Sequence, residues 1–280
     1  MIELLFPQGK EKAFTTSYDD GVKQDQLLVK MMNEHGIRGT FNLSSGLLGK
    51  KDQAVIDGFD TDTSKIPLNE ICSVYEGYEI ACHAHTHLDL TKEKEEVIDF
   101  QLETDRRILE GETGRLVQGF AYPYGAYDDG VVEKLKQNGI RYARTVNSTN
   151  QFAIPENFLT WHPTCHHNEP KLMELIADFC QNPSHTGSTG LFYLWGHAYE
   201  FDQRKNWSLI EGLFTYLDDY HDTVWLATNG EIESYVESYH RLQISTDESM
   251  IYNPSVQTVW IRCNGVTKEI QSGTSRLEQI

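Results

Sequence analysis

Short apolar runs alternate with amphipathic segments over most of the chain. Residues 13–18, 39–43 and 78–82 are predicted strands, and their length is typical of buried strands. Residues 25–35 instead repeat apolar side chains at helical spacing, and Gly36 follows as a stop. The pattern predicts strands and helices in alternation from the start of the chain.

The same alternation continues to residue 239. We expect further strands at residues 119–122, 141–146, 158–161, 190–195 and 223–227. We expect further helices at residues 66–75, 93–109, 130–137, 171–180, 208–220 and 231–239. Strands that alternate with helices run parallel and are joined by right-handed crossovers. We therefore predict the α/β class and a closed or nearly closed barrel of about seven strands.

The end of the chain follows a different pattern. Residues 255–263 and 266–271 are two apparent strands on either side of Asn264-Gly265, which is a strong hairpin signal. We therefore divide the chain into a barrel over residues 1–244 and a small β-hairpin extension over residues 245–280.

Composition narrows the classes of partner. A formal net charge of −18 argues against a nucleic acid or an anionic membrane as the main partner. The 5 cysteines form no Cys-x-x-Cys pair, which favours free thiols in a reducing compartment. The N-terminus has no basic stretch followed by a long apolar run, so we expect no signal peptide and a cytoplasmic location. Self-association into a homo-oligomer is left open.

Polar motifs follow four of the expected strands at the point where each strand ends. Asp19 and Asp20 follow the first strand, and His83 follows a later one. The segment Pro123-Tyr124-Gly125 and His197 end two more. The carboxyl ends of barrel strands converge on one face, where the active sites of such barrels lie. We therefore expect these residues to meet.

The histidines favour a metal site. His83 and His87 are four residues apart, and neutral imidazole nitrogens suit zinc and neighbouring transition metals. One carboxylate of the Asp19-Asp20 pair can complete the ligand set, and the other can accept a proton from water. The alternatives are two surface histidines and an Asx turn or helix cap. His85, between the two histidines, is expected to be a bystander.

A histidine at this edge can also act as a general acid for a departing amine. His197 needs a nearby carboxylate to keep its pKa near neutral, and Glu200 and Asp202 are the local candidates. The alternative is a histidine satisfied by a backbone carbonyl. The cluster Cys165-His166-His167 suggests a second metal only weakly, because the neighbouring Trp161 favours a substrate wall.

Together these residues resemble the polysaccharide deacetylase (NodB-homology) family, carbohydrate esterase family 4. The family motif Thr-Phe-Asp-Asp-Gly corresponds to Ser17-Tyr18-Asp19-Asp20-Gly21, and the motif His-Ser/Thr-x-x-His corresponds to His83-Ala84-His85-Thr86-His87. The motif Arg-x-Pro-Tyr-Gly corresponds to Ala121-Tyr122-Pro123-Tyr124-Gly125, and Leu-x-x-His corresponds to Leu194-Trp195-Gly196-His197. The resemblance covers residues 13–239.

The resemblance implies a distorted (β/α) barrel and roles for five side chains. Asp19 would be the catalytic base and His197 the catalytic acid. Asp20, His83 and His87 would hold one divalent metal, for which we expect zinc, with cobalt, manganese, nickel or iron as alternatives.

The same resemblance implies how the substrate is held. The backbone N–H of Tyr124, between Pro123 and Gly125, would help to stabilise the oxyanion. Trp161, Trp195 and Tyr124 offer flat apolar faces on which a sugar can pack.

Two positions depart from the family pattern. Ala84 replaces a Ser or Thr that supports the metal loop, and Ala121 replaces the arginine that orients the base aspartate. From its strand position Arg144 could reach the same place, so we expect it to orient Asp19.

The sequence thus predicts a metal-dependent hydrolase that removes N- or O-acetyl groups from a carbohydrate. A hydrolase of another amide, such as a cyclic imide or ureide, is an alternative, because relatives of this fold include such enzymes. A non-catalytic carbohydrate-binding homologue is a third, and the intact set of site residues argues against it.

Overall fold

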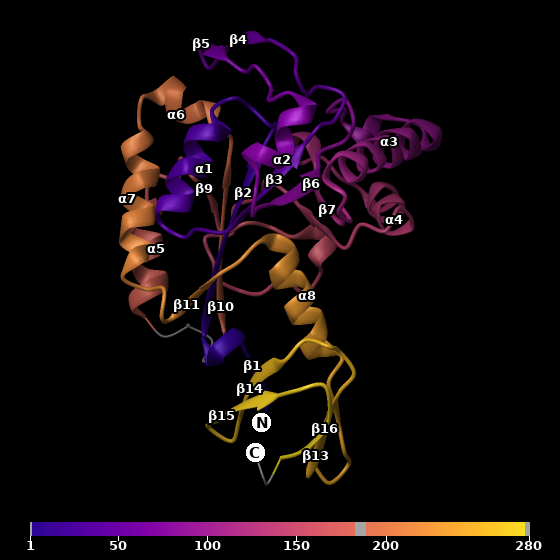
Figure 1. Ribbon diagram of the computed structural model, residues 1–280, viewed down its shortest axis with the longest axis vertical. Helices are drawn as coiled ribbons and strands as arrows, with labels where there is room; N and C mark the ends of the chain where they lie inside the picture. Colours follow the sequence, from indigo (N-terminus) through magenta and orange to yellow (C-terminus); the bar gives the residue numbers. More distant parts are fainter. Residues whose placement is uncertain (1, 183–188, 278–280) are drawn as a thin grey trace.

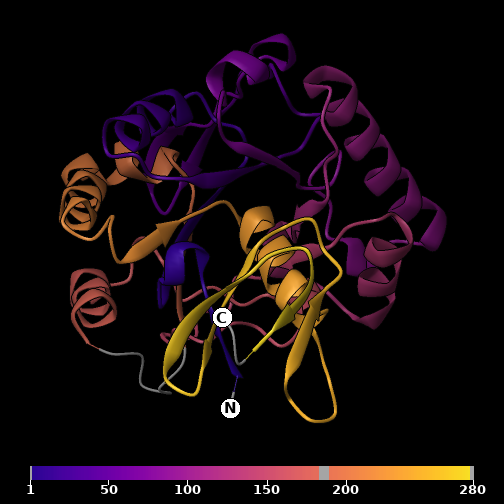
Figure 2. The ribbon, with the colours of Figure 1, turned by 60° about the horizontal axis from the view of Figure 1, so that its bottom comes forward.

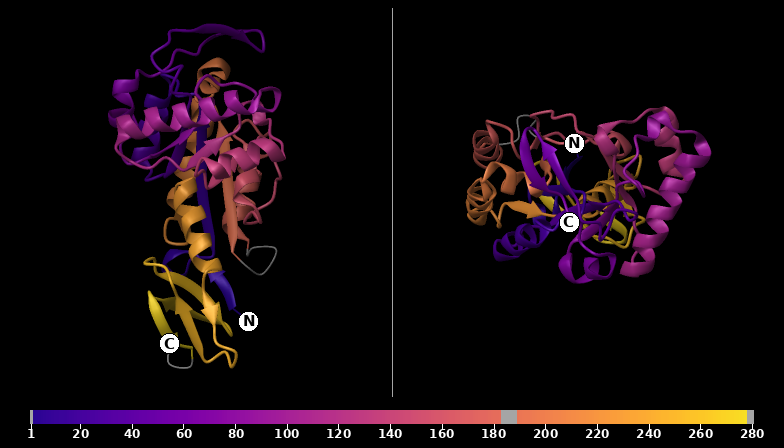
Figure 3. Two further views of the ribbon diagram at one scale, coloured as in Figure 1. Left: turned by 90° about the vertical axis from the view of Figure 1, so that its right-hand side faces the viewer. Right: turned by 90° about the horizontal axis from the view of Figure 1, so that it is seen from above.

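A barrel-like sheet forms one end of an elongated molecule and a small all-β unit forms the other (Figure 1). The computed structural model describes residues 2–182 and 189–277. Helix α8 (Asn229–His240) leads from the barrel to the β unit (Figure 3). Among the described residues, no helix combines the length and the apolarity needed to cross a membrane.

The described residues include a central sheet of 8 strands, all paired in parallel. Its order is β8-β7-β6-β3-β2-β10-β9, and β11 pairs with the start of β2. The strands are β2 (Lys12–Asp19), β3 (Gly39–Leu43), β6 (Glu79–Cys82), β7 (Gly119–Ala121), β8 (Tyr142–Arg144), β9 (Cys165–His166), β10 (Gly190–Gly196) and β11 (Val224–Leu226). The predicted α/β barrel of about seven parallel strands is confirmed.

The two edges of the sheet are linked by the chain that follows β8. Trp161 forms a parallel bridge to Arg144 at the end of β8, and β9 then pairs with β10. The sheet therefore curls until its first and last strands are joined by one segment.

Helices surround the sheet, as the view along the barrel shows (Figure 2). They are α1 (Asp25–Glu34), α2 (Ile71–Val74), α3 (Glu95–Thr113), α4 (Asp129–Gln137), α5 (Leu172–Gln181), α6 (Tyr199–Arg204) and α7 (Trp207–Asp218). Because helices cover one face and side chains fill the other, β10 is buried at every residue and β2 at all but its first. This explains why β10 is a continuous apolar run in the sequence, whereas β2 also buries the polar residues Thr15, Thr16 and Ser17.

Two predicted elements differ from the structure. Residues 158–161, expected as a strand, begin with the 3-10 turn Phe158–Thr160, because the side chain of Asn157 accepts a hydrogen bond from the Leu159 N–H (2.9 Å). The helix expected at 66–75 is divided into the turn Leu68–Glu70 and the short α2. The polar stretch after residue 50 contains a hairpin, β4 (Gln53–Ile56) and β5 (Phe59–Asp62).

The β unit consists of two three-stranded sheets. One contains β1 (Ile2–Leu5), β14 (Val259–Cys263) and β15 (Val266–Ile270), and the other contains β12 (Gln243–Ile244), β13 (Met250–Asn253) and β16 (Gly273–Arg276). Asn264 and Gly265 have φ of 52° and 82°, as a tight turn between β14 and β15 requires, so the predicted hairpin is confirmed.

The first strand of the chain pairs with the tail. Residues 2–5 lie antiparallel to β14, with Ile2 opposite Cys263. Sequence reasoning placed residues 2–5 in the barrel part, and nothing in their local pattern indicates a partner more than 250 residues away. The domain boundary at residue 244 stays a prediction. Although β1 precedes that boundary in the sequence, it pairs with a strand of the β unit.

Candidate active site

The polar motifs meet at the carboxyl ends of the barrel strands, away from the β unit. Asp19 ends β2 and Asp20 follows it, His83 follows β6, and His197 follows β10. Hairpin β4–β5 and helix α6 lie at the same end of the molecule (Figure 1), and the Gln203 side-chain amide donates to the Ile56 carbonyl (2.6 Å).

Left-handed backbone conformations occur in three of the predicted motifs. Four of the ten described non-glycine residues with positive φ belong to the predicted motifs: Asp20 (81°), Ala84 (57°), His87 (58°) and Tyr124 (59°). Such conformations are costly and persist where the surrounding structure enforces them, often at functional sites.

Asp20, His83 and His87 form a compact donor set. One ligand atom from each lies within 4.8 Å of the others, and His87 Nε2 is 3.8 Å from Asp20 Oδ1. His83 Nδ1 is 2.7 Å from the Ala121 carbonyl, so Nδ1–H donates there and Nε2 is left with its lone pair. Burial lowers the pKa of His83 to about 4, which keeps the ring neutral at pH 7. Two neutral imidazoles and a carboxylate fit a divalent metal of the zinc type.

The loop that carries His83 is held from helix α3. The Asp105 carboxylate accepts hydrogen bonds from the Ser45 N–H (2.7 Å) and the His83 N–H (3.0 Å). Gln101 Oε1 accepts from the Thr86 N–H (2.8 Å). Sequence reasoning missed these two residues, although four-residue spacing places them on one helical face. They support the loop that lacks a polar side chain at position 84.

Asp19 is buried between two side-chain partners, Asn42 and Arg144. The whole residue is 2% exposed. Its Oδ1 accepts a hydrogen bond from Asn42 Nδ2 (2.8 Å), and its Oδ2 forms an ion pair with the Arg144 guanidinium. Burial alone would raise the pKa of Asp19, but the charge of Arg144 holds it below its ordinary value. The structure thus places the Arg144 guanidinium against the Asp19 carboxylate, as expected from the position of Arg144 at the end of a strand. Asn42 was not anticipated.

Asp19 also lies between the donor set and His197. Its Oδ2 is 3.9 Å from His83 Nε2 and 3.9 Å from His197 Nε2. A small molecule bound beside Asp19 is therefore within reach of both groups.

His197 is oriented by Glu200 from the first turn of α6. His197 Nδ1 donates to Glu200 Oε1 (2.7 Å), which leaves Nε2 directed toward Asp19. Burial would lower the pKa of His197, but the hydrogen bond to Glu200 and the charges of Asp19 and Asp20 raise it. Asp202, the other candidate, accepts instead from Trp207 Nε1 (2.8 Å).

Lys65 is a cation at this site that the sequence did not reveal. Its Nζ is 3.4 Å from Asp20 Oδ2, and its side chain is 10% exposed. The backbone fixes it there, because the Ile66 N–H donates to the Gly21 carbonyl (2.8 Å) beside the Val22–Lys65 bridge. Burial opposes a low pKa at Asp20, but Lys65 and the neighbouring histidines lower that pKa well below its ordinary value. Lys65 ends a polar stretch without periodicity, so no sequence signal marked it.

The predicted aromatic faces differ in availability. Tyr124 is 70% exposed, and its ring meets that of His87 edge-on at 4.7 Å. Trp161 is wrongly placed in a substrate wall, because it is 1% exposed and packs in the core against Tyr193 at 4.5 Å. Trp195 is also buried and lies under the Arg144 guanidinium at 4.3 Å.

The segment around Tyr124 is tightly packed. Pro123 is buried, and Gly125 has φ of +70° with Val146 only 2.3 Å from where a Cβ would lie. Both constraints hold Tyr124 at the rim beside His87.

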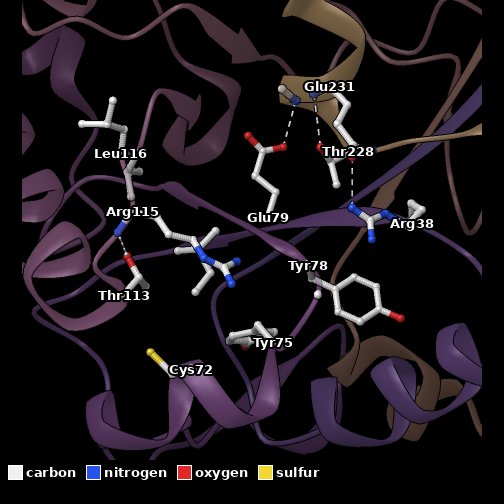
Figure 4. Close-up of a pocket in the computed structure, with 14 residues that line it drawn as sticks. Arg38, Cys72, Tyr75, Tyr78, Glu79, Thr113, Arg115, Leu116, Thr228 and Glu231 are labelled. Carbon is white, nitrogen blue, oxygen red and sulfur yellow. Dashed lines mark hydrogen bonds and ion pairs between the residues drawn. The ribbon is translucent and has the colours of Figure 1, made fainter. Parts of the chain in front are cut away.

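A cavity of about 380 Å³ lies elsewhere, at the amino end of β6 (Figure 4). Arg38, Tyr78, Glu79 and Leu116 line it, and the Glu79 carboxylate accepts from the Gly230 N–H of α8 (2.8 Å). It includes none of the predicted site residues and lies at the opposite ends of the strands, so it is not the candidate active site.

Comparison with known proteins gives a family match over the first half of the chain. The polysaccharide deacetylase family model matches residues 7–143, which include Asp19, Asp20, His83, His87 and Tyr124. His197 lies beyond the matched region. A search of curated protein sequences finds no match.

Solved structures share the fold. A protein from Mycobacterium smegmatis assigned as a polysaccharide deacetylase is 16% identical, with a TM-score of 0.59 over 85% of this chain and 94% of that one. A carbohydrate esterase family 4 pseudoenzyme from Bacillus anthracis is 15% identical, with a TM-score of 0.52 over 82% of this chain and 68% of that one. A polysaccharide deacetylase from Bacillus cereus is 20% identical, with a TM-score of 0.42 over 52% of this chain, and the match spans only 44% of that protein.

Proposed function

Because the chain belongs, through residues 7–143, to the polysaccharide deacetylase family, we propose that it is a metal-dependent hydrolase that removes N- or O-acetyl groups from a carbohydrate. The observation that carries the proposal is the position of Asp19, with a carboxylate oxygen 3.9 Å from His83 of the donor set and 3.9 Å from His197. Hydrolysis of an amide or ester requires a base beside the metal ligands and an acid close to the same point, and Asp19 and His197 meet that requirement.

Asp20, His83 and His87 would hold the metal, and zinc suits two imidazoles and a carboxylate. When bound, the ion would polarise the acetyl carbonyl and lower the pKa of water. The hydrogen bond from the His83 Nδ1–H to the Ala121 carbonyl (2.7 Å) fixes the ring and leaves Nε2 unprotonated, so that this nitrogen would be the metal ligand.

The chain's own residues then divide the proton transfers. Asp19, held by Arg144 and by Asn42 Nδ2 (2.8 Å), takes a proton from the attacking water. The backbone N–H of Tyr124 donates to the carbonyl oxygen as it gains charge. His197 donates a proton from Nε2 to the leaving nitrogen or oxygen, while its Nδ1–H stays bonded to Glu200 (2.7 Å).

A carbohydrate is the proposed substrate because Tyr124 presents an exposed ring at the rim beside His87. Tyr124 is the one exposed ring among the three predicted aromatic faces, since Trp161 and Trp195 are buried. A cytoplasmic location stays a prediction.

A substrate panel tests the proposal. We expect the zinc-loaded protein to release acetate from an N- or O-acetylated oligosaccharide and to leave cyclic imides and ureides intact. His85→Gln is the matched control, because His85 lies in the same loop but bonds to Ser45 Oγ (2.9 Å), and it should keep the activity. One structural neighbour is a pseudoenzyme, so the fold alone does not guarantee activity. If the protein binds zinc but releases acetate from none of the substrates in the panel, the proposal is refuted.

A further inference from the structure

The Glu200 carboxylate is surrounded by hydrogen-bond donors beside the proposed acid. Glu200 lies on the first turn of α6, and its side chain is 12% exposed. Its Oε1 accepts from the His197 Nδ1–H (2.7 Å), and His166 Nε2 is 3.4 Å from the same oxygen. Its Oε2 accepts from the side-chain amide of Asn168 and from His167 Nε2 (3.2 Å). A carboxylate has about four acceptor positions, and these four groups occupy them.

The other ring nitrogen of each neighbouring histidine determines where its proton lies. The Asn168 N–H donates to His166 Nδ1 (3.1 Å), so the proton of the neutral His166 ring is on Nε2, beside Glu200. His167 Nδ1 has no hydrogen-bond partner among the described residues, and burial lowers the pKa of His167 to about 4. The His167 ring is therefore neutral at pH 7 and donates its single proton from Nε2 to Glu200 Oε2. Both imidazoles thus act as donors to one carboxylate.

The donor segment is fixed by strand pairing and by close packing. The His167 N–H donates to the Trp195 carbonyl (2.8 Å), next to the pairing of β9 with β10. The His167 side chain is fully buried, and its ring lies 4.2 Å from that of Phe201. A Cβ on Gly196 would lie 2.2 Å from His167 Nδ1, so the ring needs a glycine at the position before His197. The donors are therefore fixed relative to the end of β10, where His197 follows.

We propose that residues 166–168 are positioning residues, which hold the Glu200 carboxylate in one orientation for the acid, His197. Burial would raise the pKa of Glu200, but the hydrogen bonds from its histidine partners hold that pKa below its ordinary value. Glu200 cannot rotate away from His197 without breaking its bonds to the other donors, so His197 Nε2 keeps its direction into the site. The role of His197 rests on the proposed function, whereas the arrangement of donors around Glu200 does not.

Leaving-group dependence separates a positioning role from a structural one. His167→Leu removes the Nε2–H donor, whereas His167→Gln keeps an amide N–H that can reach the same oxygen. With the zinc-loaded protein, we expect kcat for an acetylated oligosaccharide to fall at least about tenfold in His167→Leu with KM little changed, because a general acid acts in the transition state. An aryl acetate should keep its wild-type rate, because a phenolate leaves without a proton from His197. His167→Gln should restore the rate with the oligosaccharide.

Asn168→Leu is a second variant of the same kind. Asn168 is only partly buried, so its replacement disturbs the core less than a change at His167. It should show the same selective loss with the oligosaccharide. Asp19→Asn is the matched control, because loss of the proposed base should slow both substrates alike. Equal losses on both substrates in the two leucine variants, no loss on either substrate, or no recovery in His167→Gln would overturn the proposal.

The hydrogen bond from His197 to Glu200 is observed without substrate, as the imidazole N–H resonance in proton NMR. His197→Gln assigns the resonance by removing it. We expect slow exchange of this proton with water in the wild type and in His167→Gln, and fast exchange in His167→Leu and Asn168→Leu. A proton that exchanges equally slowly in both leucine variants would overturn the positioning role. Because this measurement needs no turnover, failure of the positioning role and absence of deacetylation are distinguished.

Discussion

Replacement of Arg144 by methionine tests how Asp19, the proposed base, is held. The Arg144 side chain is fully buried and forms an ion pair with Asp19, whose side chain is 3% exposed. Removal of one partner leaves the other charge buried without compensation, which costs about 3–5 kcal/mol. A native domain is stable by about 5–15 kcal/mol, so the variant should fold with a markedly lower free energy of unfolding in urea.

Arg38→Met is the matched control for this loss. Arg38 is 3.0 Å from Glu231, but the side chains are 41% and 45% exposed, and such surface pairs contribute about 0–1 kcal/mol. Asp19→Asn in the Arg144→Met background should recover part of the stability, because no charge is then left buried. We also expect kcat/KM for acetate release to fall about 100-fold in Arg144→Met. The reasoning is refuted if Arg144→Met is as stable as Arg38→Met or keeps its kcat/KM.

Three further substitutions test the charges around the site. Lys65→Met should strengthen zinc binding and widen the difference in Tm between metal-free and zinc-loaded protein, because the ammonium 3.4 Å from Asp20 competes with the ion; weaker binding by titration would contradict this. Glu200→Gln should move the alkaline limb of the kcat/KM profile to lower pH, because Glu200 raises the pKa of His197 and the acid must be protonated; an unmoved limb would count against the pair. Burial raises the pKa of Asp25 to about 8, so the folded chain keeps a proton that the unfolded chain loses near pH 4. The free energy of unfolding should therefore fall by up to about 1.4 kcal/mol per pH unit as the pH rises from about 4 to about 8. Asp25→Asn should remove this part of the pH dependence. Parallel plots of unfolding free energy against pH for the two proteins, measured in urea titrations, would show that Asp25 ionises normally.

The barrel could be predicted because most of its strands are marked locally, although β9 (Cys165–His166) is too short to give a pattern. The buried parallel strand β10 is apolar along its whole length, and the helices around the sheet follow the helical period. The partner of β1 could not be predicted, because residues 2–5 pair with residues 260–263 and no local pattern encodes so distant a contact.

The motifs of the candidate site were recognisable for a similar reason. Asp19, Asp20 and His83 directly follow strands, and strand ends of a parallel barrel share one face. Arg144 could be suspected on the same ground, from its place at the end of β8.

The supporting residues were harder to find. Lys65 comes from a loop without periodicity. Asn42 lies inside a strand that is buried at every residue, so the sequence does not indicate toward which side of the sheet its side chain points. Trp161 was misplaced because an aromatic residue near a strand end has the same pattern whether it faces the core or a cleft. Its burial against Tyr193 decides the matter only once the strands are packed.

The central claim is that Asp19 and Asp20 do different work, one as base and the other as metal ligand. The most direct test measures zinc content and acetate release together in Asp19→Asn and Asp20→Ala. We predict that Asp19→Asn keeps one zinc per chain while acetate release falls at least 100-fold, and that Asp20→Ala loses both the zinc and the activity. Full activity in Asp19→Asn, or retained zinc in Asp20→Ala, would contradict the assignment.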